Sequence, residues 1–403
     1  MKNLLKLIVV LIVVPLIMGT DWPQFRGPGG LSASSGEKVP VEFDDTKNIG
    51  WKTDLPAKGA SSPIVVGDKV IVTCSGGNDQ EQLYTVCLDA ESGKINWTQK
   101  YWATGRTLVH PLSANAAPTP ASDGKYAYSF FSSNDLACTD LDGNLIWYRA
   151  LGMDYPKAGN DVGMSASPVV KDGVVVVVVE SQGASFAMGL DTKSGKTIWT
   201  NDRKKAASWT SPMLFTAQNG STKVAVQSSD RLSIIDLKTG EVVKEFEGEG
   251  NVIPSPSVAG GVMLAPINGI TAYAMDSSDP KELWSSDQIK TSTSSVIIHD
   301  NKLYTMNRGV VASYDMKDGK QISKARVGGN YWSTPVIVGN HMYAFAQDGT
   351  GYVVSLGDEM EVVHKHQFKD EVMLGSPAIS NGAMFIRSDK SIWKITDNRG
   401  PAS

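Results

Sequence analysis

The sequence has few of the residues that usually carry chemistry. Among 403 residues it contains 3 cysteines and 5 histidines, and no two cysteines are adjacent or spaced as Cys-x-x-Cys. The formal net charge is −4, so the composition does not indicate a basic face for nucleic acid. No GxSxG, P-loop or HExxH motif is present. We therefore predict no catalytic residue, no metal site and no nucleic-acid partner.

Long apolar runs are also scarce, and the one near the N-terminus is short. It covers Leu7–Met18, follows the basic residue Lys2 and ends at Gly19 and Thr20. This pattern is typical of a secretory signal peptide, whereas a membrane-spanning helix needs about 20 apolar residues. We predict a signal peptide over residues 1–20, cleaved near Gly19 or Thr20, no transmembrane span, and a periplasmic or secreted protein. No cysteine follows the predicted cut, so we expect no lipid anchor there.

Turn residues, in contrast, are abundant, and pairs of a small residue and proline recur along the chain. They are Ser62-Pro63, Ala117-Pro118, Ser167-Pro168, Ser211-Pro212, Ser255-Pro256, Thr334-Pro335 and Ser376-Pro377. A degenerate copy without proline falls at Ser294-Ser295. The spacing of roughly 40–55 residues is the length of one four-stranded propeller blade. The sequence therefore predicts an all-β fold over residues 21–403: a single eight-bladed β-propeller of four-stranded antiparallel blades, starting near 62, 117, 167, 211, 255, 294, 334 and 376.

Each unit contains short β-prone segments, and most units also contain an aspartate followed by a tight turn. The run Val174–Val179 is entirely valine, which predicts a strand buried on both faces. In six units the third segment ends in an aspartate, and glycine or proline follows three or four residues later. Because these aspartates recur in blades that cannot share one active site, we predict that they stabilise turns. They are Asp89, Asp140, Asp191, Asp236, Asp276 and Asp315.

The fourth segment of several units carries a tryptophan. The four positions are Trp97, Trp147, Trp199 and Trp284. Other units have a different residue at this place, for example Val243 and Ser323. A large aromatic side chain at the same place in successive units favours packing between blades over ligand stacking. We predict that each tryptophan docks its blade onto the next.

The last unit has only three segments before the sequence ends. The missing one is Asn48–Leu55, whose Trp51 stands where the repeat tryptophans stand. We predict that this N-terminal strand joins the last C-terminal blade and closes the ring, which removes two open sheet edges. The preceding segment, Asp21–Asp45, is expected to pack on the surface of the ring. Within it we interpret Arg26 as a structural plug rather than a site residue.

The few cysteines and histidines allow more than one interpretation. Cys74 and Cys87 lie on consecutive predicted strands, so a disulfide across the hairpin is one arrangement. Burial of both, and of Cys138, as free thiols is the other, and we expect burial. His364 and His366 share one face of a predicted strand. We interpret them as an exposed edge pair rather than metal ligands, because no third ligand is apparent.

The mouth of the central channel is the place where we expect binding. Propellers bind through the loops there, and Arg106 and His110 lie in one of the longest loops. Trp209 and Trp332 lie just before the innermost strand of their units. These four residues are the predicted channel-mouth residues. An envelope protein, a peptide or a glycan would suit such a mouth, and we expect a monomer.

Two motifs resemble a known family. The repeat LDxxSGKxxW, at Leu88–Trp97 and Leu190–Trp199, is similar to the repeat of pyrroloquinoline-quinone (PQQ) enzymes. The opening DWPQFRGP, Asp21–Pro28, resembles the start of exported PQQ-like propeller proteins of planctomycete-type bacteria. The resemblance implies an eight-bladed propeller. It covers both quinoprotein alcohol dehydrogenases and non-enzymatic relatives such as the outer-membrane assembly factor BamB.

The resemblance also implies which groups a quinoprotein dehydrogenase would need for its cofactor and its reaction. Such enzymes use a catalytic aspartate, a calcium site of carboxylate and amide oxygens, a tryptophan floor and, in most cases, a disulfide of adjacent cysteines. The sequence lacks adjacent cysteines and the long insertions that enclose the cofactor, so we expect no cofactor. Our hypothesis is an exported, non-catalytic binding or scaffold propeller of the cell envelope. The alternatives are a PQQ- and calcium-dependent dehydrogenase with a reduced site, and a BamB-like assembly factor that lacks the acylated cysteine.

Overall fold

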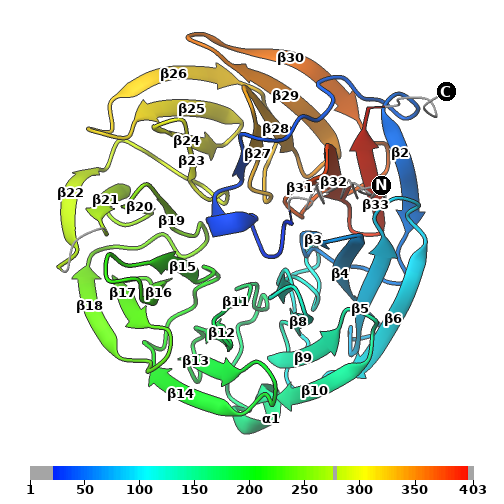
Figure 1. Ribbon diagram of the computed structural model, residues 1–403, viewed down its shortest axis with the longest axis vertical. Helices are drawn as coiled ribbons and strands as arrows, with labels where there is room; N and C mark the ends of the chain where they lie inside the picture. The colour runs from blue at the N-terminus through cyan, green and yellow to red at the C-terminus, as the bar shows by residue number, and fades with distance from the viewer. Residues whose placement is uncertain (1–20, 276–278, 398–403) are drawn as a thin grey trace, which may run out of the picture.

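Each repeat unit folds into one four-stranded antiparallel sheet, and eight such blades stand around a common axis (Figure 1). The computed structural model describes residues 21–275 and 279–397. The short β-branched segments form strands because their side chains pack on a pleated surface, and glycine turns separate them. The predicted eight-bladed β-propeller is confirmed. The predicted signal peptide, residues 1–20, and the predicted turn residue Asp276 lie outside the described residues.

The first four blades follow one another without interruption, each running from the axis outward. Their strands are β3 (Ile64–Val66), β4 (Lys69–Gly76), β5 (Gln82–Asp89) and β6 (Ile95–Trp102); β7 (Ala121–Ser122), β8 (Tyr126–Phe130), β9 (Asp135–Asp140) and β10 (Leu145–Ala150); β11 (Val169–Lys171), β12 (Val174–Val179), β13 (Phe186–Asp191) and β14 (Thr197–Asp202); β15 (Met213–Thr216), β16 (Thr222–Gln227), β17 (Arg231–Asp236) and β18 (Val242–Glu247). A short helix, α1 (Leu151–Asp154), lies between the second and third blades.

The other four blades have the same order, and the N-terminal segment contributes to two of them. Their strands are β19 (Ser257–Ala259), β20 (Val262–Ala265), β21 (Ile270–Ala274) and β22 (Lys281–Ser286); β23 (Ile297–His299), β24 (Lys302–Asn307), β25 (Val310–Asp315) and β26 (Gln321–Arg326); β27 (Val336–Val338), β28 (His341–Phe345), β29 (Thr350–Leu356) and β30 (Met360–Gln367), with β1 (Ala33–Ser34) beside β27; β31 (Ala378–Ser380), β32 (Ala383–Arg387), β33 (Ser391–Thr396) and β2 (Ile49–Asp54).

Ring closure occurs where the sequence predicts it. Strand β2 pairs antiparallel with β33, with Trp51 opposite Lys394 and Asp54 opposite Ser391. The eighth blade therefore takes its outermost strand from the beginning of the chain, which pairs the edge that β33 would otherwise leave open. The start of the second blade differs from the prediction. Strand β7 begins directly after Thr119-Pro120, so this pair, two residues later than Ala117-Pro118, is the equivalent of Ser62-Pro63 before β3.

The repeat tryptophans dock each blade onto the next. The indole N–H of Trp199 donates to the carbonyl of Leu237 in the following blade at 2.9 Å. Its ring packs on the turn glycine of that blade, where a Cβ added to Gly240 would lie 2.5 Å from the ring. The same pair of contacts recurs for Trp51, Trp97, Trp147 and Trp284. The predicted docking is confirmed, and Trp51 joins the eighth blade to the first.

One detail of this alignment requires correction. Across the strand pairs, Trp199 lies opposite Gly189 and Lys244 lies opposite Ile234, in each case just before the β-bulge. Lys244, and not Val243, therefore occupies the tryptophan place in the fourth blade. Its ammonium group pairs with Asp279 of the next blade at 2.7 Å, so an ion pair replaces the indole contact.

The five repeat aspartates among the described residues are turn residues, as predicted. A carboxylate oxygen of Asp191 accepts hydrogen bonds from the amide of Ser194 at 2.8 Å and from its hydroxyl at 2.7 Å. These bonds, that from the hydroxyl foremost, hold the pKa of Asp191 below its ordinary value. Asp89 makes the same contacts with Ser92. The turns hold the glycines against the docking tryptophans.

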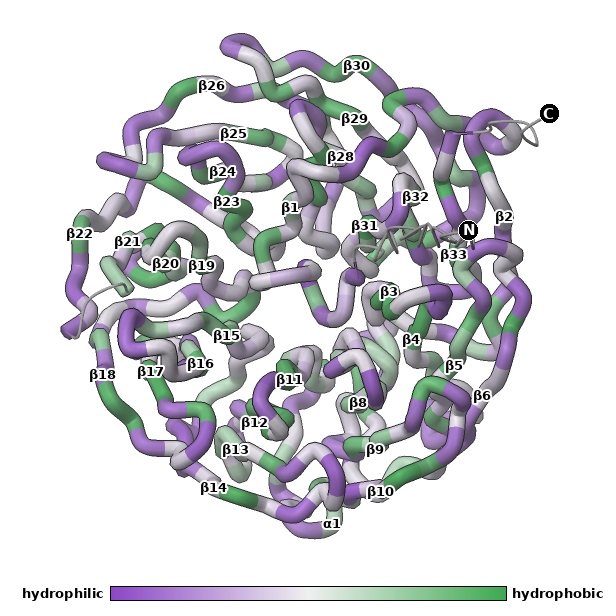
Figure 2. The backbone as a smooth tube through the Cα atoms, in the orientation of Figure 1, coloured by the Kyte–Doolittle hydropathy of each residue, from purple (hydrophilic) through white to green (hydrophobic). Residues whose placement is uncertain are grey.

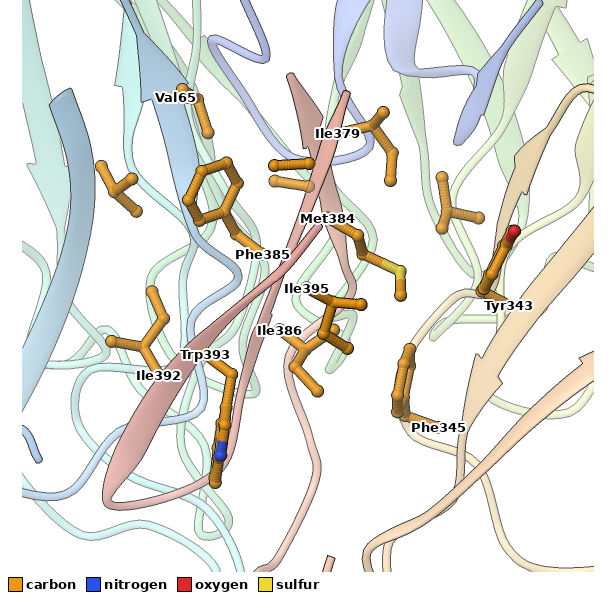
Figure 3. Close-up of a cluster of buried hydrophobic side chains, with 14 of the residues drawn as sticks. Val65, Tyr343, Phe345, Ile379, Met384, Phe385, Ile386, Ile392, Trp393 and Ile395 are labelled. Carbon is orange, nitrogen blue, oxygen red and sulfur yellow. The ribbon is translucent and has the colours of Figure 1, made fainter. Parts of the chain in front are cut away.

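The hydrophobic core is divided among the spaces between blades. In the eighth blade, Phe385 lies on the side of Val65 in the first blade, whereas Met384 lies on the side of Tyr343 and Phe345 in the seventh (Figure 3). Adjacent residues of one strand thus pack on different neighbours, because side chains alternate across a strand. The outermost strands mix hydrophilic and hydrophobic residues along the perimeter (Figure 2). All six residues of Val174–Val179 are buried, as predicted.

The three cysteines are free and buried. Cys74 lies opposite Tyr84 and Cys87 lies opposite Ile71, so the strand register separates the two thiols. Burial as small apolar residues is confirmed, and the alternative of a disulfide between Cys74 and Cys87 is wrong. Burial raises the pKa of Cys87 and of Cys138 to about 12.

The histidine pair is not an exposed edge. The Nε2 atom of His364 lies 2.7 Å from the carbonyl of Phe43, and that of His366 lies 3.1 Å from a carboxylate oxygen of Asp45. The N-terminal segment therefore covers both imidazoles, and the prediction of exposure is wrong. In the part of the chain that the structure describes, no group of three or more histidine, cysteine, aspartate or glutamate residues is arranged to hold a metal ion.

The helices of the described residues are too short to cross a membrane, and none combines the necessary length with the necessary hydropathy.

Candidate channel-mouth site

The N-terminal segment covers one end of the central channel. Trp22 forms an antiparallel bridge with Val65, the middle residue of β3, and β1 pairs with the end of β27 on another side of the ring. Between them the 3-10 helix η1 (Pro28–Gly30) contacts β15 and β19. The segment thus crosses the axis, as the dark-blue trace shows (Figure 1). The prediction that Asp21–Asp45 packs on the surface of the ring therefore holds for its later part, where Phe43 and Asp45 contact β30, but not for its first part, which lies across the channel.

Arg26 anchors this segment. Its side chain is 1% exposed, and its guanidinium donates to the carbonyls of Pro256 at 3.0 Å and Val296 at 3.2 Å and to the hydroxyl of Ser257. No carboxylate of the described residues lies within ion-pair distance of it. Burial without a counter-charge lowers the pKa of Arg26 to about 9, so the group stays charged at neutral pH. Its contacts are those of a structural plug, in agreement with the sequence-based interpretation.

A closed ring of side-chain hydroxyls surrounds the axis, and we call it the hydroxyl ring. At the start of each inner strand, one residue donates its backbone N–H to the hydroxyl of the equivalent residue in the next blade, at 2.9–3.1 Å. The eighth bond runs from the amide of Ser376 to the hydroxyl of Ser62. The members, in order, are Ser62, Thr119, Ser167, Ser211, Ser255, Ser295, Thr334 and Ser376.

A second ring lies one level above, and we call it the rim. Its members precede those of the hydroxyl ring by two residues, and alternate residues of an extended chain point to the same side. They are Ala60, Ala117, Ser165, Trp209, Ile253, Thr293, Trp332 and Leu374. The rim is bulky on the side of the later blades and small on the side of the first three. There, the two longest loops fold inward with His110, Val162 and Met164.

The two rings enclose a cavity of about 340 Å³. Every member of both rings lines it, and Phe25 of the N-terminal segment lines it as well. The N-terminal segment contacts residues that follow the hydroxyl ring along the inner strands, such as Val65 and Ser257, whereas the rim residues precede the hydroxyl ring. The cavity is therefore closed below by the N-terminal segment and opens above between the rim loops. Its size is in the range of small-molecule sites.

The structure brings three of the four predicted channel-mouth residues together. His110, Trp209 and Trp332 line the cavity, and the indole N–H of Trp209 donates to the carbonyl of Gly163 at 2.8 Å, which fixes the ring. Trp332 is 48% exposed. Arg106 is not among the lining residues; it pairs with Asp161 of the neighbouring loop at 2.8 Å.

Sequence reasoning missed the hydroxyl ring. Its signal was present, because serine or threonine stands before proline at most repeat starts. The same pairs mark the starts of the blades. That the hydroxyls meet head to tail follows from the ring geometry, since partners in neighbouring blades are about 40 or more residues apart in sequence.

The lining of the cavity does not fit a calcium–quinone group. Such a group needs carboxylate and amide oxygens, and the lining residues include no aspartate, glutamate, asparagine or glutamine. His110 is the single ionisable side chain among them. The lining offers hydroxyl donors, aliphatic surface and indole rings, which suit binding by hydrogen bonds and apolar contact.

Comparison with known proteins places this ring in a family. A family model described as outer membrane protein assembly factor BamB matches residues 27–193 and 187–400. The chain belongs to this family. Its resemblance to the PQQ-like repeat propellers is therefore confirmed.

Two curated relatives of this BamB-family chain match part of their length. An outer membrane protein assembly factor BamB from Alkalilimnicola ehrlichii is 28% identical over 213 residues, covering 52% of this chain and 49% of that protein. A polyvinylalcohol dehydrogenase from Pseudomonas sp is 24% identical over 264 residues, covering 54% of this chain and 38% of that protein. The chain thus spans about half the length, or less, of these relatives.

A solved structure shows the same fold over nearly its whole length. The crystal structure of BamB from Moraxella catarrhalis superposes with a TM-score of 0.64 at 15% identity, covering 88% of this chain and 99% of that one. At this identity the likeness concerns the architecture alone.

Proposed function

We propose that the protein is an exported, non-catalytic binding propeller of the cell envelope, which holds a ligand or a partner segment at the open mouth of its channel. The observation that carries the proposal is the donor set of the cavity: two rings of hydroxyl, aliphatic and indole groups with one ionisable side chain, His110. The bulky rim around Trp209 and Trp332 supplies the apolar contact area that binding needs. The BamB relatives support a place in the envelope, and we propose that the protein acts as a monomer without a cofactor.

A site-specific cross-linking experiment tests this proposal. A photo-reactive phenylalanine derivative replaces Trp332 at the mouth or Ile198 on the outer strand β14; these side chains have similar exposure, 48% and 46%. In envelope extracts we expect one defined adduct from position 332 and none from 198. The proposal is wrong if both positions give the same adducts, or if position 332 gives none.

Membership of the BamB family favours a second candidate, work on outer-membrane protein assembly. That activity is what the name of the relatives states, and it would make an assembly complex the partner. Affinity purification of the full chain from envelope extracts tests it. Recovery of a β-barrel assembly complex would support this candidate, and its absence under conditions that preserve such a complex would reject it.

The polyvinylalcohol dehydrogenase relative favours a third candidate, a dehydrogenase. The donor set of the cavity opposes it, because calcium and a quinone would find no carboxylate there. We therefore expect no dye reduction when the protein is supplied with PQQ, calcium and alcohols. Reduction at rates above those of the protein without PQQ would establish the enzyme and overturn the main proposal.

A further inference from the structure

We propose that the channel cavity is a receptor for a carboxylate that carries an apolar group, with the carboxylate at the hydroxyl ring and the apolar group at the rim. This inference rests on the proposed function, because both place a ligand in the same cavity. It adds the chemical class of the ligand and the orientation in which it enters.

The first argument is the hydrogen-bond state of the hydroxyl ring. Each of its oxygens already accepts a backbone N–H from the preceding blade, as Ser211 accepts from Ser167 at 2.9 Å. None of the eight donates its own hydrogen to another described residue. A hydroxyl that accepts a bond is a stronger donor. The ring therefore presents hydrogen-bond donors to whatever occupies the cavity, which suits an acceptor-rich group.

The second argument is the charge behind the ring. Arg26 reaches the carbonyl of Ser255, a member of the ring, at 3.4 Å. Arg387 donates to the carbonyls of Ser61, the neighbour of another member, at 3.2 Å and of Thr73 at 2.7 Å. Both guanidiniums are fully buried, and neither has a carboxylate within ion-pair distance among the described residues.

Two guanidiniums without a carboxylate in ion-pair contact among the described residues therefore lie just outside a cavity whose lining contains no acidic side chain, and Asp389 acts on Arg387 only at longer range. In surroundings of low dielectric constant their field reaches the cavity with little screening. This field favours an anion over a neutral acceptor and disfavours a cation. A carboxylate satisfies both the donors and the field.

The third argument is the shape of the site. The N-terminal segment with Phe25 lines the lower end, so we infer that a ligand enters from the other end, between the rim loops. A group that reaches the hydroxyl ring leaves the rest of the molecule beside Trp209, Trp332 and Leu374. The ligand is therefore polar at its tip and apolar behind it. A free aryl- or alkyl-carboxylic acid has this form, and so does the C-terminus of a polypeptide that ends in an apolar residue.

Calorimetric titration of the full chain tests the inference. The probes are 3-phenylpropionate and its amide, and N-acetyl-Ala-Ala-Phe with a free or an amidated C-terminus. We expect each acid to bind about tenfold tighter than its amide, since hydrogen bonds to a charged group are stronger than those to a neutral one. Preference for the peptide acid over phenylpropionate would identify a chain terminus as the source, and the reverse would identify a small molecule.

Substitution in the hydroxyl ring locates the effect. We expect Ser211→Ala to weaken binding of the acids about three- to tenfold. Ser211→Thr keeps the hydroxyl and should bind as the native protein does, because the ring already has threonine at 119 and 334. Thermal unfolding of both variants shows whether the ring itself survives. If Ser211→Ala does not fold, Ser376→Ala, on the opposite side of the ring, takes its place.

The outcomes separate this inference from the proposed function. Equal affinity for acid and amide, with loss of both in Trp332→Ala, would overturn the carboxylate assignment and leave the binding mouth standing. Tighter binding of a cation, such as a phenylalkylamine, would overturn the assignment as well. Failure of every probe to bind, acid or neutral, would count against both proposals.

Discussion

The blades of this ring are joined at two levels, and the two levels differ in regularity. On the outside, five blades dock through a tryptophan, whereas Lys244, Ser323 and His364 occupy the same place in the other three. On the inside, all eight blades contribute a hydroxyl to one closed ring. Docking on the outside tolerates different chemistry, since an ion pair or the N-terminal segment can cover the same area. The complete inner ring shows that the channel wall depends on one kind of group.

The strongest way to test the outer level is removal of one docking tryptophan. Trp199→Ala deletes the ring on Gly240 and the bond to Leu237, and Trp199 is 7% exposed. We expect a loss of about 3–5 kcal/mol in the free energy of unfolding, measured by urea denaturation. Ile198→Ala, at its exposed neighbour, should cost less than about 0.5 kcal/mol. Equal effects of the two substitutions would show that docking contributes little.

Substitution of Gly240, on which Trp199 packs, should have a smaller effect on stability than loss of Trp199, and one that is easier to interpret. Gly240 and Gly220 both have positive φ, 74° and 79°, but only at Gly240 would a Cβ meet a ring. We expect Gly240→Ala to destabilise the protein by about 1–3 kcal/mol more than Gly220→Ala, because the backbone strain is shared and the contact with Trp199 is not. Urea denaturation of both variants measures the difference, and no difference would contradict close docking.

Two buried thiols beside the docking tryptophans predict that the stability of the protein depends on pH. Cys87 and Cys138 lie opposite Trp97 and Trp147, and burial raises the pKa of each thiol to about 12. Between about pH 9 and pH 12 the unfolded thiols lose protons that the folded ones keep, so stability falls as pH rises. Each group contributes up to about 1.4 kcal/mol per pH unit.

Unfolding of the native protein and Cys138→Ala between pH 8 and pH 11 checks this slope. The variant should lose stability less steeply than the native protein, whatever its stability at pH 8. Identical slopes would mean that the Cys138 thiol is accessible to solvent in the folded state. As a second check, a thiol reagent should not react with Cys87 or Cys138 in the folded native protein, and should react with them once the protein is unfolded.

The smallest effect on stability belongs to the rim. Trp332 is 48% exposed, and its indole N–H bonds to Gln347 at 2.9 Å. We expect Trp332→Ala to change the free energy of unfolding by less than about 1 kcal/mol, since it fills no buried space. The same variant should lose ligand binding. A large loss of stability would instead show that Trp332, like Trp199, holds the blades together.

Much of the propeller fold could be predicted because the sequence patterns that specify it are local and recur in successive units. The turn of Asp191, the docking of Trp199 and the closing strand around Trp51 each depend on a pattern visible within one unit or against its copies. The second blade start was misplaced because Ala117-Pro118 and Thr119-Pro120 are consecutive, and only strand register distinguishes them. The covering of His364 was missed because Phe43 is 321 residues away in sequence.

The sequence by itself determined the number of blades, the closing strand and the tryptophans that dock five of the blades, because equivalent positions can be compared between successive units. Only the tertiary structure decided what the channel is. In the folded chain the Arg26 segment lies across one end of the channel, Arg106 lies outside the cavity, and eight hydroxyls form a ring around it. These groups come from every blade and meet only when the ring closes, so no single stretch of sequence contains the site.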